Sequence, residues 1–284
     1  MPICSRPGCS KWRVGEEPTR SCSWFPVRLA PSSLRRLSGE DLSIPWLRSR
    51  TDLALSERAA ALFPPLGGAD GWSVRFGREL NATEDRQLLR SPGNGLPVVG
   101  GRQIRPFTVD LESSRWAIGR RDALARLRDA RHTRPRLAYR DVAGAANQLT
   151  LIAAILPAGC LCTHTVFSLR TPLTDDEQHF LCALFNSFVL NYLVRLRVAT
   201  HVTTAMLEGL PVPTRLDASG VADEMAGLAR AVSKRSDPRA GARLQAHAAA
   251  LYQLTTEEFD YVLSTFPLVP RKQRDDARDA FRSS

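Results

Sequence analysis

Cysteine and histidine side chains alternate in one short stretch of the chain. Cys160, Cys162 and His164 occupy every second position, so on a β-strand they would share one face. Such a face could hold three metal ligands, or a thiol nucleophile beside a base. The alternative, which we favour, is small side chains that fill the core between a sheet and a helix, with His164 at the strand edge. No fourth ligand or orienting acid is close in sequence, so we predict neither a metal site nor a catalytic residue.

Side chains that can contact DNA gather in several short segments. Reading base edges requires forked donors and mixed donor–acceptor groups, chiefly Arg, Lys, Asn and Gln, while hydroxyls and further arginines contact phosphates. For the segment with Arg102, Gln103 and Arg105, the alternative is a hairpin loop whose arginines are solvated. The candidate contacts are Arg102, Gln103 and Arg105; Arg140 with Asp141; Asn147 and Gln148; Thr163, His164 and Thr165; and, for phosphate, His201, Thr203 and Thr204.

Three apolar runs and one amphipathic segment surround these candidates. Residues 137–142, 150–156 and 163–169 are 6–8 residues long and bounded by turn formers, which predicts strands. The segment from Asp175 to about Arg197 repeats apolar residues at spacings of three and four, which predicts one long helix. Thr174 and Glu177 form a capping-box pattern at its start.

The rest of the chain predicts a mixture of strands and helices before this region and helices after it. Strands are predicted at 72–76 and 96–99, and helices at 50–62, 217–233, 240–251 and after the capping box of Thr255 and Glu258. Residues 120–134 predict a helix rich in arginine. Its arginines could contact phosphates, or they could simply form a solvated face. We expect the last residues, 271–284, to fray.

The order of these pieces resembles a known family. It resembles the C-terminal target-recognition region of adenine-specific DNA methyltransferases of fused restriction–modification and phage-defence systems. The resemblance covers roughly residues 32–268. The matching pieces are Arg140-Asp141 after the first strand, Leu156-Pro157 ending the second, Thr163-His164-Thr165, the helix with Phe185-Asn186-Ser187, the exit Leu210-Pro-Val-Pro213, and the flanking segments 78–86, 96–107 and 251–259.

The catalytic patterns of that family are missing from the chain. Its members bind S-adenosylmethionine on a glycine-rich loop and hold the flipped base with an Asn/Asp/Ser-Pro-Pro-aromatic tetrapeptide. The one Pro-Pro pair here, Pro64-Pro65, lies between Phe63 and Leu66. The resemblance therefore implies that S-adenosylmethionine binds to a missing methyltransferase part or to a partner polypeptide. A common nuclease motif, an acid two residues before a lysine, is also absent, because the residues two before the three lysines are cysteine, valine and proline.

Composition fits a polyanionic partner. The formal net charge is +10 and arginine supplies 36 of the 39 basic residues. Residues 81–140 hold 13 arginines against 6 acidic residues, so the excess is local. No apolar run reaches the length of a membrane span, and no apolar stretch follows Lys11 and Arg13 as in a secretory signal. Six cysteines in a chain of 284 residues are too few for a disulfide scaffold. We therefore expect a cytoplasmic protein with reduced thiols.

The predicted fold class is α+β: a small mixed β-sheet target-recognition domain packed on a long amphipathic helix, with a helical C-terminal region. The predicted segments are an irregular lead-in at 1–31, a mixed segment at 32–95, the recognition domain at 96–215 and the helical region at 216–284. Cys4, Cys9 and Cys22 in the lead-in lack the paired spacing of a zinc site.

These observations support three hypotheses. The first is a sequence-specific module for double-stranded DNA that serves a methyltransferase or restriction polypeptide and is itself not catalytic. The second is a protein-interaction module that docks through its helices and binds DNA incidentally. The third is an enzyme that uses Cys160, Cys162 and His164. The position of the basic excess relative to the polar loops distinguishes the first two.

Overall fold

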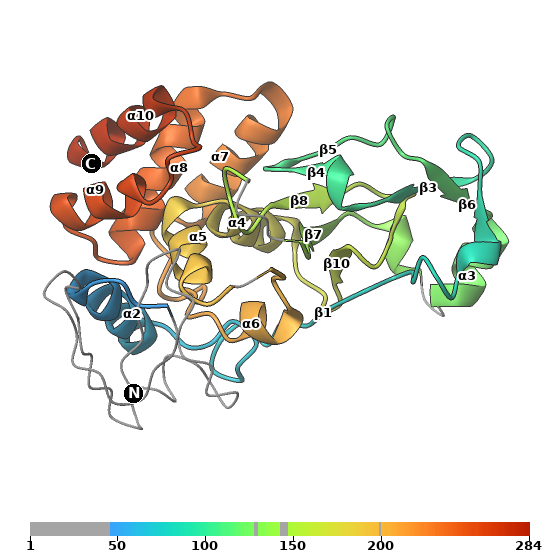
Figure 1. Ribbon diagram of the computed structural model, residues 1–284, viewed down its shortest axis with the longest axis horizontal. Coiled ribbons are helices and arrows are strands. Elements are labelled where there is room, and N and C mark those ends of the chain that lie inside the picture. The colour runs from blue at the N-terminus through green and yellow to red at the C-terminus, as the bar shows by residue number, and fades with distance from the viewer. Residues whose placement is uncertain (1–45, 128–129, 143–146, 199) are drawn as a thin grey trace, which may run out of the picture.

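The computed structural model describes residues 46–127, 130–142, 147–198 and 200–284. Helices and small sheets both contribute, which confirms the α+β class. Figure 1 shows the C-terminal helices at one end, a small sheet with helix α3 at the other, and strands β7, β8 and β10 between them. The predicted lead-in at 1–31, with Cys4, Cys9 and Cys22, lies outside the described residues.

The central sheet contains the three predicted core strands. Its order is β1 (Phe76–Gly77), β10 (Val166–Leu169), β7 (Arg136–Arg140) and β8 (Ala153–Leu156), and all pairs are antiparallel. The strands are shorter than predicted. The amides of Thr150 and Leu151 donate to a side chain of the helix behind the sheet, and residues 163–165 form a turn closed by Val166 N–H and Thr163 O (3.1 Å).

A second, mixed sheet forms the opposite end of the molecule. Its order is β2 (Leu89–Arg90), β6 (Trp116–Ile118), β3 (Leu96–Val99) and β9 (Leu161–Cys162), with β3 and β9 parallel. Helix α3 (Arg120–Leu127) covers it, through an apolar cluster that includes Val98, Ile118 and Ala123. We call residues 80–127 with β9 the outer lobe; α3 and β6 mark it in Figure 1. The hairpin of β4 (Ile104–Arg105) and β5 (Thr108–Val109) lies against β8, where Phe107 N donates to Ala153 O (2.9 Å).

The predicted long helix is wrong in one respect, because the chain breaks it at Asn186 and Ser187. Helix α4 spans Asp175–Phe185 and α5 spans Phe188–Arg195. Ser187 adopts an extended conformation and its Oγ accepts a hydrogen bond from Leu190 N, which caps α5. Asn186 bonds both backbone groups of Ala153 on β8. The break therefore lets a buried amide fix the sheet to the helices. The capping box of Thr174 and Glu177 is confirmed.

The C-terminal region is helical as predicted. It comprises α7 (Ala222–Arg235), α8 (Pro238–Leu251), α9 (Thr256–Ser264) and α10 (Arg271–Arg282). The expectation that residues 271–284 fray is wrong, because α10 packs on the region with Ala277 buried and the Phe281 ring 5.1 Å from that of Phe259. The predicted N-terminal helix is α2 (Arg50–Leu62), which Arg58 ties to α9 through Glu258.

One apolar core joins most of these elements. It includes residues from Leu55 on α2 to Ala277 on α10, together with the buried faces of α4, α5 and the central sheet. The predicted segments 32–95, 96–215 and 216–284 all contribute side chains to it. Their boundaries as domains stay a prediction.

Candidate nucleic-acid interface

Two predicted contact segments meet where β3 ends. Gly101 N donates to Thr165 Oγ1 (2.9 Å), and Thr163 N donates to Val99 O (2.9 Å). The hydroxyls of Thr163 and Thr165 lie 3.1 Å apart. A Cβ added at Gly101 would lie 3.3 Å from Thr165 O, so glycine permits this close approach. The loop after β3 and the turn before β10 therefore form one surface, although they are far apart in sequence.

Gln103 shapes this surface from within. Its side chain is buried, its Oε1 accepts from Gly100 N (2.9 Å), and its Nε2 donates to Ser113 O (3.0 Å). Both polar groups are thus engaged inside the loop, whereas Arg102 and Arg105 are exposed on either side. Gln103 thus ties the loop backbone at Gly100 to that at Ser113, and the predicted DNA contacts of all three residues stay predictions.

Arg140 and His164 contribute polar atoms that lack a partner. Arg140 lies on β7 opposite Val166, so it is adjacent to the turn that holds His164. The Nε of Arg140 and the Nδ1 of His164 are buried without a hydrogen-bond partner in the described part of the chain. Partial burial lowers the pKa of Arg140. A half-buried guanidinium that forms no salt bridge in the described part of the chain suits an anionic ligand.

The loop after α5 joins the same surface through Asp141. Val202 N donates to Asp141 O (2.8 Å), and His201 Nδ1 lies 3.3 Å from Asp141 Oδ1. Thr203 caps the short helix α6 (Thr204–Glu208), because its Oγ1 accepts from Met206 N (3.2 Å). The structure thus brings together Arg102, Gln103, Arg140, Thr163, His164, Thr165, Thr203 and Thr204, and we call this set the polar row.

Asn147 and Gln148 lie apart from the polar row. Gln148 is exposed and Asn147 half-buried. Gln148 and Arg105 line a groove of about 600 Å³ that Lys272 of α10 also borders. Residues 143–146, which complete the predicted contact loop, lie outside the described residues. The candidate contacts therefore occupy two places rather than one.

Several arginines counted from the sequence serve inside the protein. Arg126 pairs with Asp85 (2.7 Å), Arg90 pairs with Asp122 (2.6 Å), and the Arg86 guanidinium lies 4.6 Å from the centre of the Trp116 ring. Arg136 is buried against Glu79. Sequence spacing gave no signal for these pairs, because the partners are far apart along the chain.

Other arginines of this region remain exposed and unpaired. The outer lobe and its borders carry six exposed arginines that form neither a salt bridge nor a ring contact among residues 46–127, 130–142, 147–198 and 200–284: Arg102, Arg105, Arg115, Arg120, Arg121 and Arg134. Arg120 and Arg121 begin α3, Arg115 directly precedes β6, and Arg102 belongs to the polar row. Arg115 lies near the end of β3 that carries the polar row, because Trp116 pairs with Val98, whereas Arg120 and Arg121 follow Ile118, which pairs with Leu96 at the other end of β3.

The alternating cysteines fill the core. Cys160 and Cys162 are buried, and burial raises the pKa of the Cys160 thiol to about 11 and that of Cys162 well above its usual range. A thiol with a raised pKa is a poor nucleophile and a poor metal ligand at neutral pH. Within the described residues no three His, Cys, Asp or Glu side chains are placed to hold a metal ion. These observations favour the core interpretation over an enzyme at Cys160, Cys162 and His164.

Arg78 is a feature that sequence reasoning did not single out. Its Nη2 lies 3.5 Å from Asp141 Oδ2, and its guanidinium lies 5.0 Å from the centre of the Phe167 ring. It is half exposed beside Asp141. Its place in a segment with family resemblance was the one available signal.

Among the helices in the described part of the chain, none is long and apolar enough to cross a membrane.

Comparison with known proteins finds only weak structural similarity. No protein-family model matches the chain, and no curated protein matches it. A solved structure of the HsdS subunit from Thermoanaerobacter tengcongensis is similar at 15% identity and a TM-score of 0.33, over 82% of this chain and 51% of that one. A chain from a study of complex assembly and conformational transition of the type I R-M system is similar at 17% identity and a TM-score of 0.32, over 72% and 50%. The chain thus spans about half the length of each, and similarity of this size carries no argument about fold or function.

Proposed function

We propose that the chain is a sequence-specific recognition module for double-stranded DNA. It supplies specificity to an adenine-specific DNA methyltransferase or restriction–modification system of the phage-defence kind, whose catalytic part binds S-adenosylmethionine elsewhere. One observation carries the proposal: Arg102 of the polar row and Arg115 near the same end of β3 are exposed and form no salt bridge in the described part of the chain. An uncompensated basic surface beside polar loops is the footprint of a nucleic-acid site.

The two groups of residues have different tasks. Arg115, Arg120 and Arg121 provide a grip on phosphates that depends on salt, because each phosphate contact releases condensed counterions. Base edges are read by residues on the two rigidly held segments, above all Arg102 beside the buried Gln103. A good bidentate contact contributes about 1–3 kcal/mol of discrimination against the wrong base.

A salt titration of affinity tests the phosphate grip. We expect the double variant Arg120→Met, Arg121→Met to lower the slope of log affinity against log salt by about two. Arg235→Met is the matched control, because Arg235 is an exposed arginine of α7 without a salt bridge in the described residues. An unchanged slope in the double variant, or an equal loss in the control, contradicts the proposed surface.

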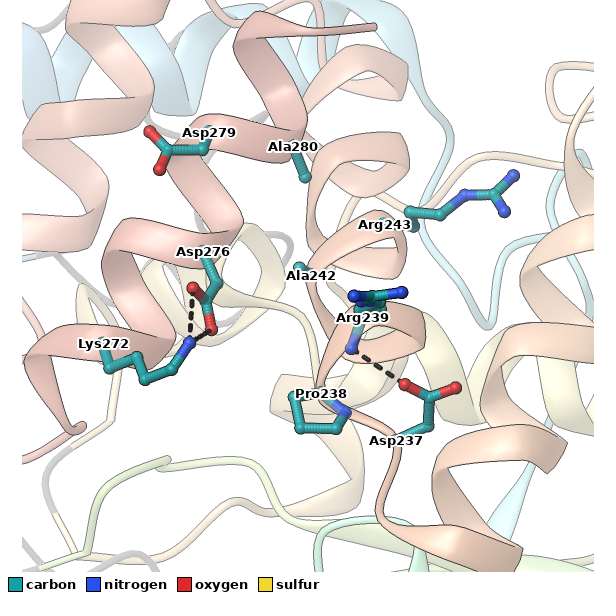
Figure 2. Close-up of a pocket in the computed structure, with 9 residues that line it drawn as sticks. All are labelled: Asp237, Pro238, Arg239, Ala242, Arg243, Lys272, Asp276, Asp279 and Ala280. Carbon is teal, nitrogen blue, oxygen red and sulfur yellow. Dashed lines mark hydrogen bonds and ion pairs between the residues drawn. The ribbon is translucent and has the colours of Figure 1, made fainter.

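A protein-interaction module is the second candidate, and one surface favours it. A groove of about 570 Å³ lies between α8 and α10, lined by charged residues of both signs. Figure 2 shows Lys272 bound to Asp276 on one wall, with Arg239 and Arg243 on the other. Mixed charge suits a protein partner better than DNA. Loss of a cognate subunit's binding in Arg239→Glu, with DNA affinity unchanged, supports this candidate.

A further inference from the structure

Helices α4 and α5 hold the segment that follows the predicted contact residues Asn147 and Gln148. Asn191 Oδ1 accepts from Thr150 N (2.9 Å) and Leu151 N (2.8 Å). Its amide nitrogen donates to Phe185 O and Ser187 O, both at 2.9 Å, at the break between the helices. Asn191 is fully buried. The backbone of residues 150 and 151 is therefore held by the Asn191 side chain, whose amide oxygen and amide nitrogen are both hydrogen-bonded.

Arg195, one helical turn after Asn191, extends this grip toward Gln148. Its Nη2 donates to Gln148 O (2.9 Å) and its Nε donates to Thr150 Oγ1 (2.9 Å). Its third nitrogen, Nη1, donates to Thr265 O at the end of α9 (2.6 Å), and the guanidinium lies 4.0 Å from the centre of the Phe266 ring. One side chain thus joins the root of the contact segment to the C-terminal helices.

The environment of Arg195 indicates that geometry rather than charge pairing keeps it there. Burial lowers the pKa of Arg195 to about 10, and the nearby Arg48 adds to this effect. The three bonded partners are neutral oxygens, and no salt bridge to Arg195 occurs in the described part of the chain. A planar guanidinium can bond three oxygens in fixed directions, which a flexible ammonium cannot.

We infer that Arg195, supported by Asn191, is a positioning residue for DNA recognition by Asn147 and Gln148. This role rests on the proposed function. By fixing the carbonyl of Gln148, Arg195 sets the backbone from which the exposed Gln148 side chain projects. Base discrimination depends on such placement, because a hydrogen bond to a base edge weakens steeply when its geometry is lost.

The test compares Arg195→Met with a matched control. Arg58→Met is suitable because Arg58 also makes three hydrogen bonds, to Glu258 and Gln253 O, but joins α2 to the start of α9 and makes no bond to the contact segment. Both variants lose an arginine that links two elements, so a general loss of stability affects both. Arg195→Lys is the conservative variant.

Two readouts are measured. The first is the ratio of the affinity for duplexes that the wild-type chain enriches from a random pool to the affinity for unselected duplexes. The second is the hydrogen exchange of the amides of residues 148–151. We expect Arg195→Met to lower the affinity ratio by about tenfold, the size of one lost base contact. Exchange of the Thr150 and Leu151 amides should speed up in the same variant and stay unchanged in Arg58→Met. Lysine should restore part of both, since it can reach one of the three oxygens.

The outcomes separate this inference from the proposed function. If Arg195→Met keeps the wild-type affinity ratio and exchange pattern, the positioning role is refuted while DNA recognition stands. An equal fall in the ratio in Arg58→Met also refutes it. If the wild-type chain does not discriminate between DNA sequences, the proposed function fails, and the role of Arg195 in recognition fails with it. Hydrogen exchange then measures only how Arg195 holds the backbone of residues 148–151.

Discussion

The buried ion pair between Glu79 and Arg136 gives the sharpest prediction about stability. Arg136 Nε and Nη2 donate to the two carboxylate oxygens of Glu79 at 2.6 and 2.7 Å, and the side chains are 5% and 0% exposed. Glu79 also accepts from Cys162 N on β9 (2.8 Å) and from Ser168 Oγ on β10 (2.9 Å). The pair therefore joins the central sheet to the outer lobe.

Removing one partner should cost much more than removing both. Glu79→Gln or Arg136→Met leaves a buried charge uncompensated, for which the expected loss is about 3–5 kcal/mol in the free energy of unfolding. The double variant Glu79→Leu, Arg136→Met replaces both charges with apolar groups and should lose less than either single variant. Urea unfolding followed by circular dichroism measures all three. A loss below about 1 kcal/mol in the single variants, the value of an exposed pair, refutes the reasoning.

The same pair makes stability depend on pH. Burial alone would raise the pKa of Glu79, but the hydrogen bonds and charge of Arg136, with Cys162 N and Ser168, hold it below the usual 4.5. Because the folded-state pKa is depressed, the contribution is complete above the unfolded value and is lost as pH falls through the folded one. We expect the urea midpoint of unfolding of the wild-type chain to decrease as the pH is lowered below about 4.5. The Glu79→Gln variant should lack this part of the decrease.

Three further predictions concern local features. Ser187→Ala removes the cap of α5 and should lower the free energy of unfolding by about 1 kcal/mol, measured by urea titration; a loss near zero means that the helix break does not need the cap. Arg102→Ala and Arg105→Ala should each weaken DNA binding and lower the salt slope by about 0.9, and unchanged affinity in both removes this loop from the interface. At pH 8 a thiol with a pKa of about 11 is ionised in roughly one molecule in a thousand, so Cys160 should react slowly with a thiol reagent in the folded chain and quickly in urea. Rapid labelling of Cys160 in the folded chain, read by peptide mass spectrometry, contradicts its place in the core.

Features set by neighbouring residues were predictable from the sequence. The capping boxes that begin α4 at Thr174 and α9 at Thr255 involve residues three apart, and the structure has both. The apolar runs gave the strands β7, β8 and β10 because burial on a sheet imposes their pattern. Their ends were misplaced, since the amides of residues 150 and 151 bond Asn191, which is 40 residues away.

Features set by distant partners could not be predicted. The periodic pattern of 175–197 continues through Asn186 and Ser187, so it predicts one helix; the break depends on bonds from Asn186 to Ala153 on a strand. The arginine count could not separate Arg126, which pairs with Asp85, from Arg121, which forms no salt bridge among the described residues. Likewise, the sequence could not show that the side chain of Gln103, whose DNA contact stays a prediction, has both of its polar groups hydrogen-bonded inside the loop.

The most direct test of the central claim is selection from a pool of random DNA duplexes by the purified chain, with sequencing of the retained fraction at two salt concentrations. We predict one enriched motif at both salts, with total retention lower at the higher salt because phosphate contacts are screened. Retention without any motif, lost at the higher salt, would mean a phosphate grip alone and would contradict sequence-specific recognition. The absence of binding at both salts would contradict DNA binding by this chain and favour the interaction module.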